Sequence, residues 1–324
     1  MRKNEYVNLP VICLVGPTAS GKSGLAVRVC RRLYVDEHPA EIINTDSMVV
    51  YRGMDIGTAT PTLREQRTVV HHLVSILDVT VPSSLVLMQT LARDAVEDCL
   101  SRGVIPVLVG GSALYTKAII DEMSIPPTDP EVRARWQEKL DAEGPRVLHD
   151  ELARRDPKAA ESILPGNGRR IVRALEVIDL TGSFTATIPD GTLHWPKTVQ
   201  MGLELPRKDI DQRIADRVDQ MWADGFVDEV RSLANVGLRE GLTASRALGY
   251  RQVLEYLNGD YDEDEARRRT IIGTRRFARK QLMWYRRDDR IEWFNALAPD
   301  LDDRVVARVL TALTTCLLYT SPSP

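Results

Sequence analysis

The sequence predicts an α/β protein built on a parallel sheet, and three segments carry this prediction. A short apolar run, VICLV at 11–15, leads into GPTASGKS and then into a helical pattern. Two further apolar runs, EIINTD at 41–46 and IPVLVGG at 105–111, end in polar or glycine residues, as buried parallel strands do. Between them, residues 86–100 have helical spacing closed by Gly103, which suits a crossover helix.

Length and composition indicate one large domain or a domain with an insertion. The chain has 324 residues and is 43% hydrophobic, enough for a substantial core. The apolar run near the start is too short for a signal peptide or a membrane span, so we expect a cytoplasmic protein without a membrane partner. Four cysteines are scattered without a CxxC pair, and Cys13 and Cys30 have apolar neighbours. This suggests neither zinc nor disulfides.

The residue pattern changes after Ile120, from apolar strand-like runs to short charged segments. Residues 122–197 begin with the breaker-rich SIPPTDP and continue as short charged helical stretches, so we expect a helical insertion domain. VQMGLEL at 199–205 resembles another core strand, followed by helices near 207–236, 245–257 and 264–287. The predicted catalytic core is therefore 1–121 and 198–313. The uncharged end, 314–324, is expected to be a disordered tail or a sequence-assembly scar.

The loop after the first strand has the pattern GxxxxGK[ST], which predicts a P-loop NTPase-like core. Gly16 and Gly21 permit a tight wrap that points amide groups at phosphate oxygens, Lys22 supplies charge, and Ser23 can ligate Mg²⁺. The helix N-terminus adds a favourable dipole. Such a loop binds a diphosphate and does not name its ligand. The predicted phosphate-binding residues are Gly16, Pro17, Thr18, Ala19, Ser20, Gly21, Lys22 and Ser23.

Asp46 ends the second predicted strand, at the sheet edge where parallel α/β proteins place functional groups. It could organise Mg²⁺, act as a general base toward an acceptor, or serve as a helix N-cap or turn residue. His71 and His72 are adjacent and point in different directions, with no third ligand evident in the sequence. We expect a structural or supporting role for them.

A basic segment stands out from the net charge of −3. Nine Lys or Arg residues and no acids occur from Arg267 to Arg287. On a helical wheel, four of them fall within about 40°, a stripe made of Arg268, Arg275, Arg279 and Arg286. An adjacent apolar face of Ile271, Ala278, Leu282 and Tyr285 can pack on the core. This pattern favours contact with a polyanion such as nucleic acid over an ordinary solvated helix.

Several motifs, taken in order, resemble the tRNA dimethylallyltransferase family of bacterial tRNA-modifying prenyltransferases. They span Val11 to Phe294 and comprise GPTASGKS, TDSMVVYRGMDIGTATPT, HHLVSILD, LVGGSALY, RRIVRALEV, RVDQM, RALGYRQVLEYL and RRFARKQLMWYRR. The combination is specific, whereas the phosphate loop alone would fit many families. The resemblance implies transfer of a dimethylallyl group from dimethylallyl diphosphate to the exocyclic amine (N6) of the adenosine on the 3′ side of the anticodon, with Mg²⁺ as cofactor.

The resemblance also implies residue roles. Asp46 corresponds to the general base, Ser112 to a loop threonine near the bridging oxygen, and Arg217 to a diphosphate ligand. Ser23 would hold Mg²⁺. The implied partner is the tRNA anticodon stem-loop, bound by a monomer. The residues implied to bind tRNA are Asp46, Ser47, Met48, Val49, Arg169, Arg170, Arg173, Arg246, Gly249, Tyr250, Arg251, Arg275, Arg279, Lys280 and Arg286.

The chain departs from the family pattern at three places. Ser112 replaces the common threonine, Val49 replaces a usual glutamine, and GNGRR replaces a DPQR-like stretch. Ser112 keeps a hydroxyl, whereas Val49 cannot donate or accept a hydrogen bond through its side chain. The zinc-finger extension of eukaryotic relatives is absent from the sequence. The alternatives that remain are a P-loop small-molecule kinase, an RNA-binding ATPase, and a prenyltransferase of free adenine nucleotides.

Overall fold

The structure is a computed structural model that describes residues 9–184 and 191–318. It divides into two compact units, one formed by Met1–Asp121 with Leu193–Pro324 and the other by Glu122–Thr192. Each unit has a hydrophobic core of its own.

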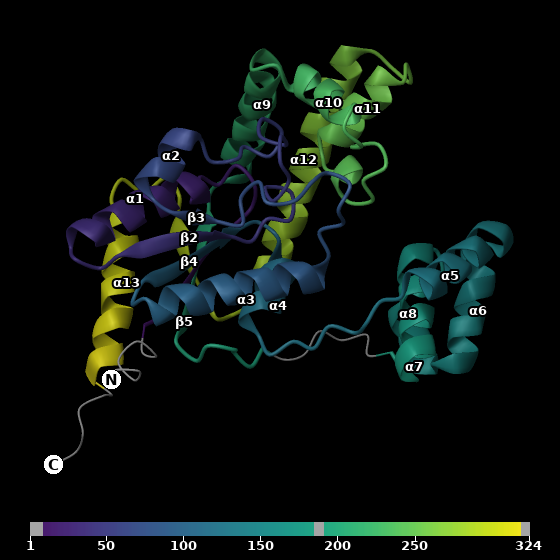
Figure 1. Ribbon diagram of the computed structural model, residues 1–324, viewed down its shortest axis with the longest axis horizontal. Helices are drawn as coiled ribbons and strands as arrows, with labels where there is room; N and C mark the ends of the chain where they lie inside the picture. The colour runs from purple at the N-terminus through teal and green to yellow at the C-terminus, as the bar shows by residue number, and fades with distance from the viewer. Residues whose placement is uncertain (1–8, 185–190, 319–324) are drawn as a thin grey trace. The chain divides into compact units, whose positions relative to one another are not determined.

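The first unit is built on a six-stranded sheet in which every strand pairing is parallel (Figure 1). The strand order is β3-β2-β4-β1-β5-β6. The central strand β1 is fully buried, as its uninterrupted apolar sequence requires. The strands are β1 (Val11–Val15), β2 (Ala40–Asn44), β3 (His71–His72), β4 (Ile105–Gly110), β5 (Thr198–Glu204) and β6 (Ile291–Asn295).

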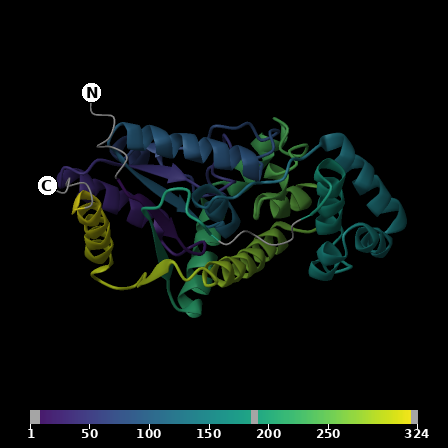
Figure 2. The same cartoon turned by 90° about the horizontal axis from the view of Figure 1, so that it is seen from below.

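Helices cover both faces of this sheet (Figure 2). On one face α1 (Lys22–Val35) packs beside α13 (Leu301–Leu318), and on the other α3 (Leu85–Ser101) packs beside α4 (Ala113–Ile120). The short helix α2 (Leu63–Thr68) begins at a capping box formed by Thr62 and Glu65. This doubly covered parallel sheet is the P-loop type of α/β core that the sequence predicts.

A group of helices follows β5, and all of them except the last, α12, contribute to a second apolar cluster with the loop after β2. The members are α9 (Arg207–Ala223), α10 (Phe226–Ala234), the 3-10 helix η2 (Ala244–Arg246), α11 (Tyr250–Leu257) and α12 (Glu263–Tyr285). Gly225 has φ +93° and divides α9 from α10, where the sequence predicted one helix from 207 to 236. Helix α12 packs on α9 and α11 and also contacts α4.

The second unit is entirely helical in its described part. Its helices are α5 (Pro130–Glu143), α6 (Pro145–Arg155), α7 (Pro157–Ser162) and α8 (Gly168–Thr181). Proline occupies the first turn of α5, α6 and α7, and Asp129 and Asp156 cap α5 and α7. The core centres on α8, whose buried Glu176 accepts a hydrogen bond from Arg173.

Two details differ from the sequence-based prediction. Helix α13 continues to Leu318, so residues 314–318 are helical and the expected disordered tail is wrong there; 319–324 lie outside the described residues. The strands β3 and β6 were not predicted, because β3 has only two residues and the sequence of β6, IEWFN, has no regular alternation of apolar and polar residues. Cys13, Cys30 and Cys99 are free and buried, and burial raises the pKa of Cys30 to about 12. No described helix is both long and apolar enough to cross a bilayer.

Candidate active site

The phosphate loop connects β1 to α1 at the carboxyl edge of the sheet. Gly16 has φ +150°, and a Cβ there would lie 2.9 Å from the Leu203 carbonyl oxygen. Ala19 and Gly21 also have positive φ, of +63° and +91°. The loop therefore folds back over the N-terminus of α1, the arrangement that exposes backbone amides to an anion.

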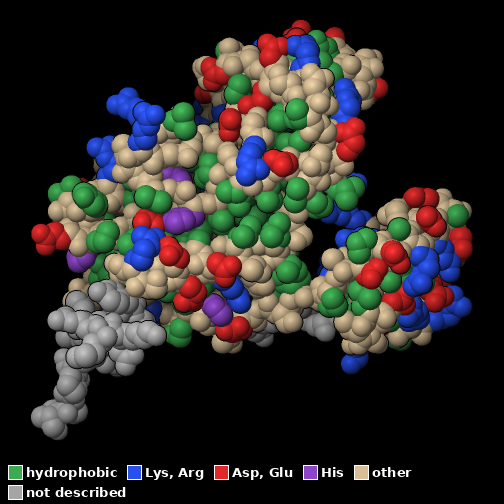
Figure 3. All heavy atoms as spheres, in the orientation of Figure 1, with side chains coloured by type: hydrophobic (Ala, Val, Ile, Leu, Met, Phe, Trp, Pro, Cys, Tyr) green, Lys and Arg blue, Asp and Glu red, His purple; other side chains and the backbone are tan. Residues whose placement is uncertain are grey.

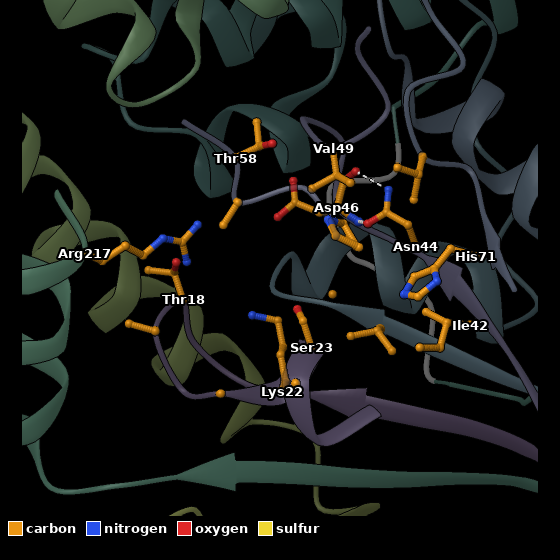
Figure 4. Close-up of a pocket in the computed structure, with 18 of the residues that line it drawn as sticks. Thr18, Lys22, Ser23, Ile42, Asn44, Asp46, Val49, Thr58, His71 and Arg217 are labelled. Carbon is orange, nitrogen blue, oxygen red and sulfur yellow. Dashed lines mark hydrogen bonds between the residues drawn. The ribbon is translucent and has the colours of Figure 1, made fainter. Parts of the chain in front are cut away.

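A cavity of about 360 Å³ opens beside this loop (Figure 4). Its size suits a small ligand. Side chains from β1–α1, β2, β4 and α9 line it, and Lys22, Asp46 and Arg217 reach it from three different elements. The lining residues are Thr18, Ala19, Gly21, Lys22, Ser23, Gly24, Ile42, Asn44, Asp46, Val49, Thr58, Ala59, Pro61, His71, Val74, Val109, Gly110, Arg213 and Arg217.

The cations of this cavity are under-neutralised. Burial lowers the pKa of Lys22 to about 8, with Asp46 opposing the shift and Arg217 adding to it. Burial also lowers the pKa of Arg217, and its Nε is buried without a hydrogen-bond partner among the described residues. Lys22 Nζ donates to the Pro17 carbonyl at 3.3 Å. Positive charge crowded into a buried site is stabilised when an anion binds there.

Asp46 sits in a turn directly after β2. Asn44 fixes this turn, because its Oδ1 accepts from the Asp46 amide at 2.9 Å and its Nδ2 donates to the Asp46 carbonyl at 2.9 Å. Asp46 Oδ1 accepts a hydrogen bond from the Met48 amide at 2.9 Å, so Asp46 does stabilise a turn. It does not cap a helix, because no helix starts here. Within the described part of the chain, Oδ2 has no hydrogen-bond partner. One oxygen thus orients the carboxylate while the other remains open to the cavity.

The structure also places the candidates for metal and bridging-oxygen contacts. Ser23, at the start of α1, lines the cavity together with Asp46. A hydroxyl and a carboxylate beside a phosphate site are the oxygen ligands that Mg²⁺ prefers, so these residues fit that ion. Ser112 caps α4 without a side-chain cap bond, and it is not among the residues that line the cavity. Val49 lines it and is only 9% exposed.

The basic stripe predicted on α12 is wrong in its continuity. Arg268 pairs with Glu265 one turn earlier at 2.6 Å, Arg275 donates to the Asp211 carbonyl at 2.9 Å, and Arg286 lies 3.2 Å from Glu204. The acids that pair with these arginines come from the first turn of α12, which lies before the basic segment, and from other elements of the fold. Figure 3 shows acidic and basic side chains mixed over α10 and α11.

Some α12 cations remain exposed. Arg276, Arg279 and Lys280 have no acidic partner among the described residues and lie on one side of the helix. The apolar face packs inward as predicted at Ala278 and Tyr285, which are buried.

The other candidate tRNA contacts differ in exposure. Arg246 and Arg251 are exposed on η2 and α11, whereas Gly249 and Tyr250 between them are buried. The Tyr250 ring packs edge-on against Phe226, so its side chain does not reach the surface.

In the helical unit, Arg169 and Arg170 are exposed, but Arg173 is held by the buried Glu176 and by the Pro126 and Pro127 carbonyls. Ser47 and Met48 are half-buried beside Asp46.

Sequence reasoning missed several residues at the cavity. Arg213 lines it together with Arg217, and the spacing of four on α9 is a signal that could have revealed this. Thr58 and Ala59 line it from the loop after β2. Gln281 of α12 accepts a hydrogen bond from the Thr18 amide at 2.9 Å, although the two residues are 263 positions apart. No local pattern announces that contact.

The two histidines have separate roles. His71 lines the cavity, its Nδ1 lies 2.8 Å from the Val69 carbonyl, and burial lowers its pKa. His72 Nε2 is 2.7 Å from Glu41, and Glu41, His72 and Cys99 form a group of three possible metal ligands that does not include His71. Arg102 donates to both Glu41 oxygens, at 2.6 and 2.8 Å.

Comparisons with known proteins agree with one another. The family model described as IPP transferase matches residues 49–288. The chain is 99% identical to a tRNA dimethylallyltransferase of Cutibacterium acnes over 97% of this chain and 99% of that protein. It is 55% identical to the tRNA dimethylallyltransferase of Thermobifida fusca over 92% and 94%. A solved tRNA isopentenylpyrophosphate transferase of Bacillus halodurans superposes with a TM-score of 0.70 at 35% identity, covering 96% of this chain and 98% of that one.

The matches to the Cutibacterium acnes protein and to the Bacillus halodurans structure include the phosphate loop and the helices that follow β5, whereas the family model begins after that loop, at residue 49. The chain therefore belongs to the IPP transferase family, the family of the tRNA dimethylallyltransferases.

Proposed function

We propose that this chain transfers the dimethylallyl group of dimethylallyl diphosphate to N6 of the adenosine on the 3′ side of the anticodon in tRNA. The observation that carries the proposal is the meeting of Lys22, Arg217 and Asp46 at one cavity. Two under-neutralised cations suit the diphosphate, and an oriented carboxylate suits a proton acceptor.

In this mechanism the phosphate loop holds the leaving group. The diphosphate oxygens are bound by backbone amides of the loop, to which Pro17 contributes none, and by the side chains of Lys22 and Arg217. These donors stabilise the charge that develops as the allylic C–O bond breaks. Arg217 Nε, which lacks a partner, gains one. The adenine N6 forms the new N–C bond, and its proton passes to the Asp46 carboxylate. The products are prenylated adenosine and free diphosphate.

Mg²⁺ fits beside the loop, where the Ser23 hydroxyl would hold it. When bound, it would neutralise diphosphate charge and make the leaving group better. Ser112 directly follows Gly111, where an added Cβ would lie 3.3 Å from Lys22 Nζ. We assign it a contact to the donor rather than a proton transfer.

The acceptor binds through exposed cations. Arg276, Arg279 and Lys280 on α12, with Arg246 and Arg251, offer positive charge to phosphates of the anticodon stem-loop. The target base leaves its stack to enter the cavity, at a cost that is smaller in a loop than in a duplex. Arg169 and Arg170 add a basic edge to the helical insertion. We further expect the enzyme to act as a monomer in the cytoplasm, where tRNA is available.

One experiment separates the remaining alternatives. Protein is incubated with labelled dimethylallyl diphosphate and Mg²⁺, with bulk tRNA, AMP or ATP added in separate reactions. We expect label on tRNA alone and no requirement for ATP. Label on AMP would identify a nucleotide prenyltransferase, and turnover that needs ATP would overturn the assignment of the donor.

A further inference from the structure

One carboxylate, Glu229 on α10, binds the loop that follows β2. Its Oε2 accepts hydrogen bonds from the Asp55 amide at 3.0 Å and the Ile56 amide at 2.7 Å, and its Oε1 accepts from the Gly57 amide at 3.3 Å. Oε1 also accepts from the Tyr250 hydroxyl at 2.6 Å. Three consecutive amides converging on an anion form a nest, and bonds to an ionised acceptor are stronger than neutral ones.

The held loop forms a wall of the cavity. Thr58 and Ala59, which directly follow the three bound amides, line it, and Figure 4 shows Thr58 across the cavity from Lys22 and Ser23. The conformation of this loop is specifically stabilised, because Thr58 Oγ1 donates a hydrogen bond to the Met54 carbonyl, and Ala59 adopts a left-handed backbone conformation with φ +51°. If the phosphate loop holds the diphosphate, as proposed above, this wall faces the remaining part of the substrates.

Packing against α10 and α11 leaves the loop little freedom. A Cβ at Gly57 would lie 2.4 Å from the Phe226 ring and 2.5 Å from the Tyr250 ring. Tyr250 is fully buried, and burial together with the charge of Glu229 raises its pKa well above the ordinary value, so its hydroxyl remains a donor at neutral pH. Arg251 follows Tyr250 on the exposed side of α11.

We propose that Glu229 is a positioning residue for the transfer reaction: it fixes the 55–59 loop so that Thr58 and Ala59 form the cavity wall opposite the phosphate loop. Through Tyr250, the same carboxylate ties this wall to the helix that carries Arg251. The inference rests on the proposed function. It explains why Tyr250 and Gly249 belong to a sequence stretch associated with tRNA although both are buried.

The test compares Glu229→Gln, which removes the charge and keeps the size, with Asp228→Asn. Asp228 is the neighbouring exposed acid, and among the described residues it pairs only with Arg231 on the same helix. Single-turnover transfer to tRNA, affinity for inorganic diphosphate and melting temperature are measured for both. We expect Glu229→Gln to slow transfer by ~10- to 100-fold while the diphosphate Kd stays within about 2-fold, because only the wall moves. Asp228→Asn should match wild type.

A folded Glu229→Gln protein that transfers at the wild-type rate would overturn the proposal, as would an equal loss of rate and diphosphate affinity. If Glu229→Gln does not fold, Tyr250→Phe removes one of the four bonds and keeps the ring. We then expect a rate loss of ~3- to 10-fold at unchanged diphosphate affinity; a wild-type rate would refute the positioning role. Failure of the proposed function is distinguishable, because wild-type protein itself would then leave tRNA unlabelled.

Discussion

At the scale of single residues, the decisive group is Asp46, and Asp46→Asn tests its role while keeping its shape. The amide retains an oxygen for the Met48 contact, so the turn should survive. If the carboxylate accepts the N6 proton, single-turnover transfer should slow by roughly 10²- to 10⁴-fold, equivalent to about 3 to 5 kcal/mol of barrier. Donor affinity should persist.

The matched control is Asp78→Asn. Asp78 is an exposed aspartate that pairs with Arg52, so its replacement should leave the rate unchanged. A raised Mg²⁺ requirement with a normal saturating rate would instead assign Asp46 to the metal. A lower melting temperature with a normal rate would leave it only the turn.

Lys22 makes a pH-dependent prediction for the protein without ligand. Its pKa is lowered to about 8, so the ammonium is charged below that pH and loses its charge as the pH rises through it. Diphosphate affinity should therefore fall above pH 8. Lys22→Arg should flatten this fall, because a guanidinium stays protonated. Calorimetric titration of the same ligand into both proteins cancels the ionisation of diphosphate itself; parallel pH profiles would contradict the assignment.

At the scale of elements, α12 serves two purposes. Its buried side holds Gln281 against the phosphate loop, and its exposed side carries Arg276, Arg279 and Lys280. Arg279→Ala with Lys280→Ala should weaken tRNA binding and reduce the slope of log Kd against log salt by ~0.7 to 0.9 per lost phosphate contact. Diphosphate affinity should not change.

Arg31→Ala with Arg32→Ala, two exposed arginines of α1, is the control and should leave the salt slope as it is. Arg275 is a poor choice for this experiment, because it donates to the Asp211 carbonyl and joins α12 to α9. A salt slope equal to that of wild type in the α12 variant would remove this surface from the interface.

At the scale of the whole molecule, the helical unit can be deleted, because the two chain segments that enter and leave it lie next to each other. The Glu122 amide donates to the Thr192 carbonyl at 2.7 Å, so a short glycine link between these residues should replace 123–191 without strain. Since the sheet has its own core, we expect the shortened protein to fold and bind diphosphate. Its tRNA Kd should rise at least ~10-fold as phosphate contacts are lost. An unchanged Kd would exclude the insertion from tRNA binding.

The sequence by itself determined the parts of this protein that depend on local pattern. The phosphate loop, the buried strands β1, β2, β4 and β5, and the crossover helix follow from apolar periodicity and from glycines at fixed offsets, which act within a few residues. Asp46 was placed at the cavity because the carboxyl ends of parallel strands share one edge.

Only the tertiary structure decided which charges remain available. Whether an arginine is free depends on acids far along the chain, as with Arg275 and Asp211, or Arg286 and Glu204, 82 positions apart. The burial of Tyr250 is a second example. The resemblance placed this residue among those that bind tRNA, whereas in the fold its side chain packs against Phe226 and donates to Glu229. Side-chain pairing and burial arise from elements brought together by the fold, and short-range sequence patterns do not encode them.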